Sequence, residues 1–241
     1  MNSYSPNLKT LNREKRHLAF RIIILVSLTL ILMLVPDSIS PALPGQFFKR
    51  FTLLHLFWGL WMIYMTIKLL PFLKLHNRSE NRQFAAFFRP CANMPGKEHI
   101  RRLLRKSNLK AIKSAVAWLV LTAFIGIMRR LQVIHERGLV ILTGIFYVCD
   151  LICVIYYCPF QHLLMKNSCC NSCRIHNWDA IMMFTPMAFV NSFFGISLFA
   201  VSALIFILWE LRCNLFPERF FPCSNANTRC DACPDHLCKI R

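Results

Sequence analysis

The sequence predicts an all-α membrane protein: a polytopic helix bundle of about five transmembrane helices, with a Cys-rich inter-helix loop and a Cys-rich C-terminal tail. Three observations predict this class. Hydrophobic residues fill 56% of the 241 positions, above the share of about 45–50% in soluble domains. They come in blocks of membrane-spanning length. The net charge of +18 comes from residues between and beside these blocks, which fits orientation in a membrane and argues against a nucleic-acid partner.

The predicted bundle covers residues 1–209 and the tail covers 210–241. The five spans are expected at about 18–35, 51–73, 114–128, 138–158 and 180–209. The first apolar run follows basic residues, as in a secretory signal peptide. Pro41 directly after the small residues of Ser38-Ile39-Ser40 should hinder cleavage, so an uncleaved anchor is favoured.

The three middle spans differ in how clearly the sequence indicates a transmembrane helix. The second carries Trp58, Trp61 and Tyr64, and Pro71 falls in its last turn, where interfacial water can satisfy a freed carbonyl. The third is short, but the segment before it is also helical in pattern. The fourth is a plain apolar block.

The fifth predicted span is too long for a simple crossing. Its thirty residues, 180–209, would measure about 45 Å as a straight helix. The helix must therefore tilt, project or break, and Pro186 is the obvious place for a break.

The distribution of Lys and Arg residues predicts how the chain is oriented in the membrane. With five crossings and the N-terminus inside, seventeen of these residues lie inside and ten outside, mainly because of the basic loop 74–113. The positive-inside rule thus predicts a multi-pass protein of the cell or cytoplasmic membrane with a cytoplasmic N-terminus. The basic turn 129–137, which this arrangement places outside, is its weak point.

The segment 97–113 has the pattern of an amphipathic helix lying at the lipid surface. Its candidate lipid-binding residues are Arg101, Arg102, Arg105, Lys106 and Lys110. They are expected to bind anionic lipid or an acidic partner such as another membrane protein. The alternative is a topology determinant that anchors the third span.

A first cysteine cluster follows the fourth span: Cys158, Cys169, Cys170 and Cys173. In a reducing cytoplasm, clustered thiols and the nearby histidines indicate a site for zinc or an iron–sulfur cluster, since both prefer thiolate. Only the C-x-x-C pair of this cluster has a metal-ligand spacing. Structural or incidental thiols are the alternative.

A second cluster lies in the tail: Cys223, Cys230, Cys233 and Cys238. Five crossings put the tail outside the cytoplasm, where two disulfides are expected. In the cytoplasm the same spacing would suit a four-thiolate metal site. An even number of spans moves the tail to the cytoplasm, and losing the third span would also move the first cluster outside, so both interpretations depend on the number of crossings.

Charged residues at membrane depth are functional candidates by default. Asp150 lies twelve residues into the fourth span, and Lys68, in the second, could neutralise it. The alternatives are an ion pair within the bundle and a proton or cation pathway. Cys149 and Cys153 are four residues apart and share one face of the fourth predicted span, the span that also carries Asp150.

Three functions remain open at this stage. Hydrolase and kinase motifs are absent. The leading hypothesis is a metal-binding or thiol-redox accessory protein that uses its clustered cysteines. The alternatives are a noncatalytic assembly protein with structural disulfides and a small transporter or channel that depends on Asp150.

Overall fold

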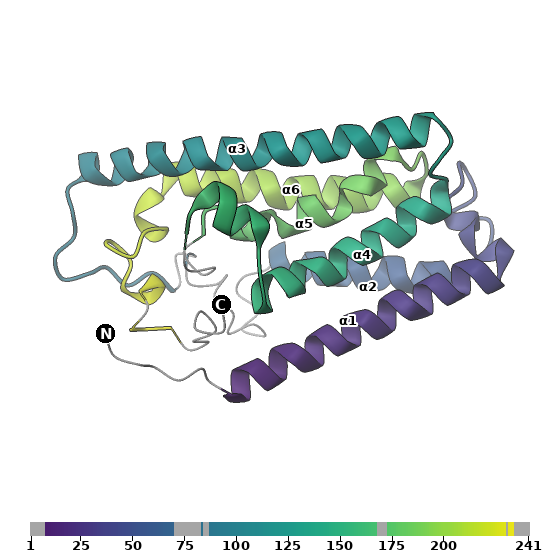
Figure 1. Ribbon diagram of the computed structural model, residues 1–241, viewed down its shortest axis with the longest axis horizontal. Coiled ribbons are helices and arrows are strands. Elements are labelled where there is room, and N and C mark those ends of the chain that lie inside the picture. Colours follow the sequence, from purple (N-terminus) through teal and green to yellow (C-terminus); the bar gives the residue numbers. More distant parts are fainter. Residues whose placement is uncertain (1–7, 70–82, 84–86, 168–172, 230, 234–241) are drawn as a thin grey trace.

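The computed structural model describes residues 8–69, 83, 87–167, 173–229 and 231–233, and these form a helical bundle without named strands (Figure 1). Its main helices are α1 (Leu8–Leu34), α2 (Leu53–Leu69), α3 (Lys97–Arg130), α4 (Glu136–Ile155) and α6 (Phe193–Leu215). Four of them are long and apolar enough to cross a membrane, and α2 is a shorter apolar helix. The predicted fold class is confirmed.

Short helical turns connect and extend these helices. They are η1 (Pro36–Ala42), the π-helical η4 (Phe160–Met165), η5 (His176–Trp178), α5 (Asp179–Phe184), η6 (Thr185–Phe189), η7 (Pro217–Arg219) and η8 (Ala226–Thr228). The chain leaves η4 through Lys166, whose φ of 47° lies in the left-handed region.

The chain runs back and forth between two ends of the bundle. The tail end holds the start of α1, the end of α4 and the tail, and the turn end holds the connections 43–52, 131–135 and 190–192. α1 and α4 are antiparallel, since Arg21 contacts Asp150 while Leu28 lies against Gly144. A Cβ on Gly144 would come within 2.9 Å of a Leu25 methyl carbon, so this glycine lets the two helices approach closely.

The fifth predicted span, 180–209, is not one helix but an antiparallel hairpin. Pro186 marks the change from α5 to η6, and the chain reverses just after it, at residues 190–192. Ser192 then caps α6 by accepting a hydrogen bond from the Gly195 amide, at 3.3 Å. Trp178, before α5, donates to Glu210 near the end of α6 at 2.7 Å. The two arms therefore lie side by side, and the chain passes along the bundle six times.

The first arm of this hairpin is short and partly non-α-helical. Irregular backbone is tolerated at membrane depth only where protein covers it. Six of its eleven residues are buried: Ala180, Met183, Phe184, Thr185, Pro186 and Met187. On one side Trp118 of α3 donates to the Thr185 hydroxyl at 3.0 Å. The arm is thus enclosed by its neighbours.

The segment 97–113 is not a separate helix on the lipid surface. It is the first half of α3, a single helix of 34 residues that runs along the bundle (Figure 1). Its apolar side packs at the tail end, where Leu104 and Ala111 join a cluster with Trp209 and Phe220. An apolar face suits packing on protein as well as contact with lipid, so the amphipathic pattern did not show that this segment and the third predicted span are one helix.

The tail packs against the connection between α2 and α3. The Cys91 amide donates to the Ser224 carbonyl at 3.2 Å, and the Ala226 amide donates to the Arg89 carbonyl at 2.8 Å. The described part of the tail and the described cysteines of the first cluster lie at the same end of the bundle, whereas the five-crossing arrangement expects them at opposite ends. The extra reversal at residues 190–192 brings both to the tail end.

The main core joins all the crossings. Its largest fully buried side chains include Leu28, Trp61, Phe184, Phe194 and Leu198. Outward-facing apolar side chains cover the helices, among them Phe20, Ile23, Leu56, Ile63, Leu119, Phe124, Ile145, Ile152, Ile196 and Ile207. A soluble protein rarely exposes so much apolar surface, and a lipid environment accounts for it.

Candidate functional site

An ion pair joins α1 to α4 near the tail end. The Arg21 side chain donates from Nη1 to Asp150 Oδ2 at 2.8 Å and to the Tyr147 carbonyl at 2.6 Å. Its guanidinium carbon lies 4.3 Å from the centroid of the Tyr147 ring, which suits a cation–π contact. Asp150 is therefore paired across the bundle, and by Arg21 rather than by the expected Lys68.

Lys68 of α2 pairs instead with Asp179 at the start of α5. Tyr64 donates from its hydroxyl to Asp179 Oδ2 at 3.3 Å. The Tyr64 ring also lies 5.0 Å from Lys68 Nζ and 5.7 Å from the Arg21 guanidinium carbon. Tyr64 thus connects the two ion pairs.

These residues form one polar centre, defined as Arg21, Tyr64, Lys68, Tyr147, Asp150 and Asp179. It holds two positive and two negative charges and joins four segments: α1, α2, α4 and α5. Paired charges in a low-dielectric site are tolerated because each partner offsets the desolvation of the other. The arrangement explains how α2 and the short α5 are held in place. Sequence reasoning assigned Arg21 to a span without a partner and left Asp179 in the preceding loop.

A cavity of about 380 Å³ lies beside the polar centre. Its apolar wall comes from α3, α4, η4 and α5: Trp118, Phe146, Ile152, Val154, Phe160, Met182 and Met183. Its thiol, imidazole and carboxyl side chains belong to Cys149, Cys153, Cys158, Cys173, His176, Asp150 and Asp179. We call this the thiol cavity.

Three of its cysteines come from α4 and the turn that follows it. Cys149 and Cys153 are one helical turn apart, as expected. After α4 ends, the chain turns at residues 156–159, and this turn brings Cys158 to the same cavity as Cys153. The Gln161 amide also donates to Cys158 Sγ at 3.4 Å.

The fourth cysteine arrives from the loop before α5. Cys173 is buried at 4% exposure. The structure therefore brings together Cys158 and Cys173 of the first predicted cluster. Cys169 and Cys170 lie outside the described residues. Cys149 and Cys153, which sequence reasoning treated mainly as small buried apolar residues, belong to the same cavity.

Two buried polar atoms at the cavity have no hydrogen-bond partner within the described chain. They are His176 Nε2 and Asp179 Oδ1. Buried polar atoms are normally paired with protein or water, so an unpaired one calls for an explanation. Both residues line the thiol cavity.

The loop carrying Cys173 and His176 is clamped by Arg174. This side chain forms two hydrogen bonds with the Glu210 carboxylate, at 2.7 and 2.5 Å, and a third with Asn108 of α3 at 3.2 Å. Burial lowers the pKa of Arg174, but hydrogen bonding to Glu210 and the charge interactions with Cys213, Glu210 and Cys173 together raise the pKa above the ordinary value. The Trp178 indole donates to the same carboxylate. The clamp holds one wall of the thiol cavity against α6 and α3.

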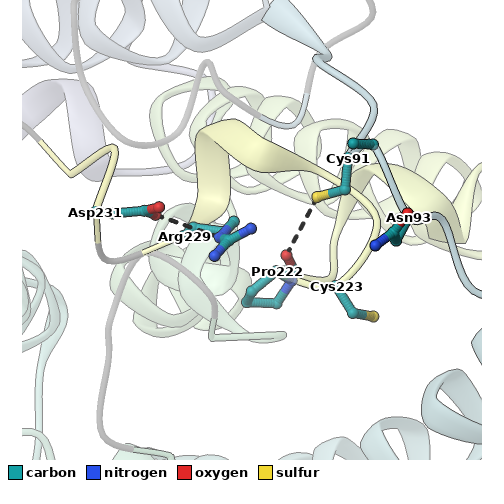
Figure 2. Close-up of a pocket in the computed structure, with 7 residues that line it drawn as sticks. Cys91, Asn93, Pro222, Cys223, Arg229 and Asp231 are labelled. Atoms are coloured by element: carbon teal, nitrogen blue, oxygen red, sulfur yellow. Dashed lines mark hydrogen bonds and ion pairs between the residues drawn. The ribbon is translucent and has the colours of Figure 1, made fainter.

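The second cysteine cluster lies partly outside the described residues, since Cys230 and Cys238 are not among them. Cys223 and Cys233 are described and form no disulfide. Cys223 lines a surface hollow with Cys91, a residue that sequence reasoning did not connect with the tail (Figure 2). The Cys91 sulfur points to the Pro222 carbonyl at 3.6 Å, while the Cys223 sulfur points away from it (Figure 2).

The candidate lipid-binding residues lie on the first half of α3. Arg101, Arg102, Arg105 and Lys106 are exposed and Lys110 is half-buried. They form a positive surface on the helix, next to the tail.

Among the residues that the structure describes, no three potential ligand side chains are grouped so that they could hold a metal ion. The described part of the predicted zinc or iron–sulfur site is the pair Cys158 and Cys173. Comparisons with protein-family models, with curated proteins and with solved structures found no match to this chain.

Proposed function

We propose that this chain is a membrane-embedded thiol redox protein whose Cys153 and Cys158 alternate between two thiols and a disulfide. The observation that carries the proposal is that both side chains line one cavity, where two further cysteines lie as well. Oxidation forms one S–S bond, releases two protons and passes two electrons to an acceptor that reaches the cavity. Cys149 and Cys173 line the same cavity and are the candidate partners for thiol exchange with that disulfide.

The position of the thiols supports this function over a purely structural one. A structural cysteine packs as a small apolar side chain, as Cys213 does in the cluster around Trp209. Cys149, Cys153 and Cys158 instead border open space, and Cys149 is exposed on the surface of α4. The transporter hypothesis depended on Asp150, whose charge is offset by Arg21. The metal hypothesis remains the alternative use of Cys158 and Cys173.

We also propose that the tail end faces the cytoplasm. In the described chain seventeen Lys and Arg residues belong to the tail end and five to the turn end, Lys49, Arg50, Arg129, Arg130 and Arg137. The positive-inside rule favours the end with the larger number. With six passes the basic tail and the basic loop share one side, and the basic turn 129–137 stays on the other side with the smaller number of charges. In a reducing cytoplasm the tail cysteines are expected as thiols.

The basic surface of α3 supports one further partner. Arg101, Arg102, Arg105 and Lys106 are placed to attract the anionic headgroups of the cytoplasmic leaflet, with each charge contributing on the order of 1 kcal/mol.

The test of the redox proposal is differential alkylation. The purified protein is reduced, then oxidised with diamide, and free thiols are alkylated before mass spectrometry. We expect a Cys153–Cys158 disulfide that Cys158→Ser abolishes and that Cys213→Ala, a matched change away from the cavity, leaves intact. Full alkylation of both cysteines after oxidation would refute the proposal. Bound zinc or iron that is lost in Cys158→Ser would establish the metal alternative in its place.

A further inference from the structure

The thiol cavity has the features of a site for an apolar ligand that enters from the membrane. Its volume of about 380 Å³ falls in the range of about 300–1,000 Å³ typical of small-molecule sites. Aromatic, aliphatic and Met side chains make up most of its wall. On its outer side Ile152 is 37% exposed and Cys149 is exposed as well, so the cavity borders the lipid-facing surface of α4.

The unpaired polar atoms add a second, independent observation. The Asp179 side chain is only 9% exposed, and its Oδ1 has no partner while Oδ2 accepts from Tyr64 and Lys68. His176 Nε2 is likewise buried and without a partner. An imidazole N–H is a donor and a carboxylate oxygen is an acceptor, so the site offers one of each. A ligand with an apolar body and a hydroxyl group has the acceptor and the donor that these two atoms call for.

The thiols restrict the ligand further. Oxidation of Cys153 and Cys158 needs an acceptor of two electrons and two protons, and a quinone is a membrane-soluble molecule of that class. Its carbonyl oxygen accepts the hydrogen bond that His176 Nε2 can donate. After reduction it carries hydroxyl groups, one of which can donate to Asp179 Oδ1. The quinone therefore pairs with His176 Nε2, and the hydroquinone can pair with Asp179 Oδ1 as well.

We propose that the thiol cavity binds a quinone and that the Cys153–Cys158 pair reduces it to the hydroquinone. This inference rests on the proposed redox function. Two S–H bonds break and one S–S bond forms. The two electrons pass to the quinone ring, and the two protons end on its oxygens. One disulfide is formed for each hydroquinone.

The chain offers a matched pair of variants on one face of α4. Ile152→Trp adds bulk at the mouth of the cavity, where the side chain is exposed. Ile145→Trp makes the same change at a position 40% exposed, about two turns away and outside the cavity lining. Both changes lie on the bundle surface, so neither is expected to prevent folding.

The experiment uses the full chain in lipid nanodiscs with reduced thiols and adds decylubiquinone as the probe. Loss of the quinone ultraviolet absorbance measures its reduction, and mass spectrometry measures the disulfide. We expect hydroquinone and Cys153–Cys158 disulfide in equal amounts in the unmodified chain and in Ile145→Trp. Ile152→Trp should reduce the quinone at least about tenfold more slowly while still forming the disulfide with diamide.

Binding is tested separately from electron transfer in Cys158→Ser. This variant should still bind decylubiquinone, seen as quenching of the fluorescence of Trp118, with Trp118→Phe as the control. If diamide forms the disulfide but the quinone is neither bound nor reduced, the inference is overturned and the proposed redox function stands. If diamide forms no disulfide, the proposed function itself fails. Equal rates in Ile145→Trp and Ile152→Trp would show that the quinone reacts elsewhere.

Discussion

The Arg21–Asp150 ion pair provides a quantitative test of the bundle. Asp150→Asn keeps the size of the side chain but leaves the Arg21 charge buried without its counterion. Breaking a buried pair from one side costs about 3–5 kcal/mol. Arg21 would keep its hydrogen bond to the Tyr147 carbonyl, at 2.6 Å, and its cation–π contact with the Tyr147 ring. The Asp150 side chain is also 21% exposed, so the pair is only partly desolvated. We therefore expect the lower end, about 3 kcal/mol of unfolding free energy.

Removing both charges should restore part of that loss. The double variant Arg21→Met with Asp150→Asn leaves no buried charge unpaired, so it should be more stable than Asp150→Asn alone by about 2 kcal/mol. The matched control is Asp231→Asn, because its pair with Arg229 is exposed, at 52% for Arg229 and 67% for Asp231. An exposed pair contributes about 0–1 kcal/mol, so this control should lie close to the unmodified chain.

The assay is reversible unfolding in mixed micelles, followed by tryptophan fluorescence. The reasoning is refuted if Asp150→Asn and Asp231→Asn have the same stability. It is also refuted if the double variant is less stable than Asp150→Asn, since the charge of Arg21 would then not be the source of the loss.

Three further predictions test the hairpin, the topology and the clamp. Gly195→Ala should lower the unfolding free energy by about 1–3 kcal/mol, because its Cβ would lie 2.5 Å from a backbone carbonyl oxygen of the turn. The control is Gly59→Ala, where a Cβ meets nothing within 4 Å, and the same assay should find no loss of stability. Cys223 should resist an impermeant maleimide in intact cells and react after permeabilisation, and labelling from outside would exclude a cytoplasmic tail. Glu210→Gln should loosen the Arg174 clamp and expose Cys173, which is 4% exposed. We expect the alkylation rate of Cys173 to rise by at least about fivefold, and an unchanged rate would mean that other contacts hold the loop.

The sequence predicts the helices well where composition alone defines them. The spans expected at 18–35, 51–73 and 138–158 overlap α1, α2 and α4, because hydropathy reports what lipid must cover. It reports much less about α3, whose polar first half continues the same helix beyond the apolar block. Nothing in the amphipathic pattern of residues 97–113 distinguishes a face that meets lipid from a face that meets the tail.

The reversal between α5 and α6 was missed for a related reason. Residues on both sides of it are apolar, so hydropathy runs on without a gap. The local signals were present: Pro186 was noted, but Ser192 as a helix cap and Gly195 three residues later were not read as the start of a new helix. Pairings such as Arg21 with Asp150 join positions 129 residues apart, and a single sequence does not reveal them. Cys158 and Cys173 of the thiol cavity were singled out from the sequence, as part of a metal site that stays a prediction.

The short first arm of the hairpin has a consequence for how the protein is made. Its eleven residues fall below the roughly 20 that a lone helix needs to cross a bilayer. A nascent chain that ends near Asn191 has no α6 to cover this arm, so the arm cannot remain stably in lipid. Only after synthesis of α6 can both arms enter together as one unit. We therefore expect that the side on which the tail resides is decided only after α6 has been synthesised.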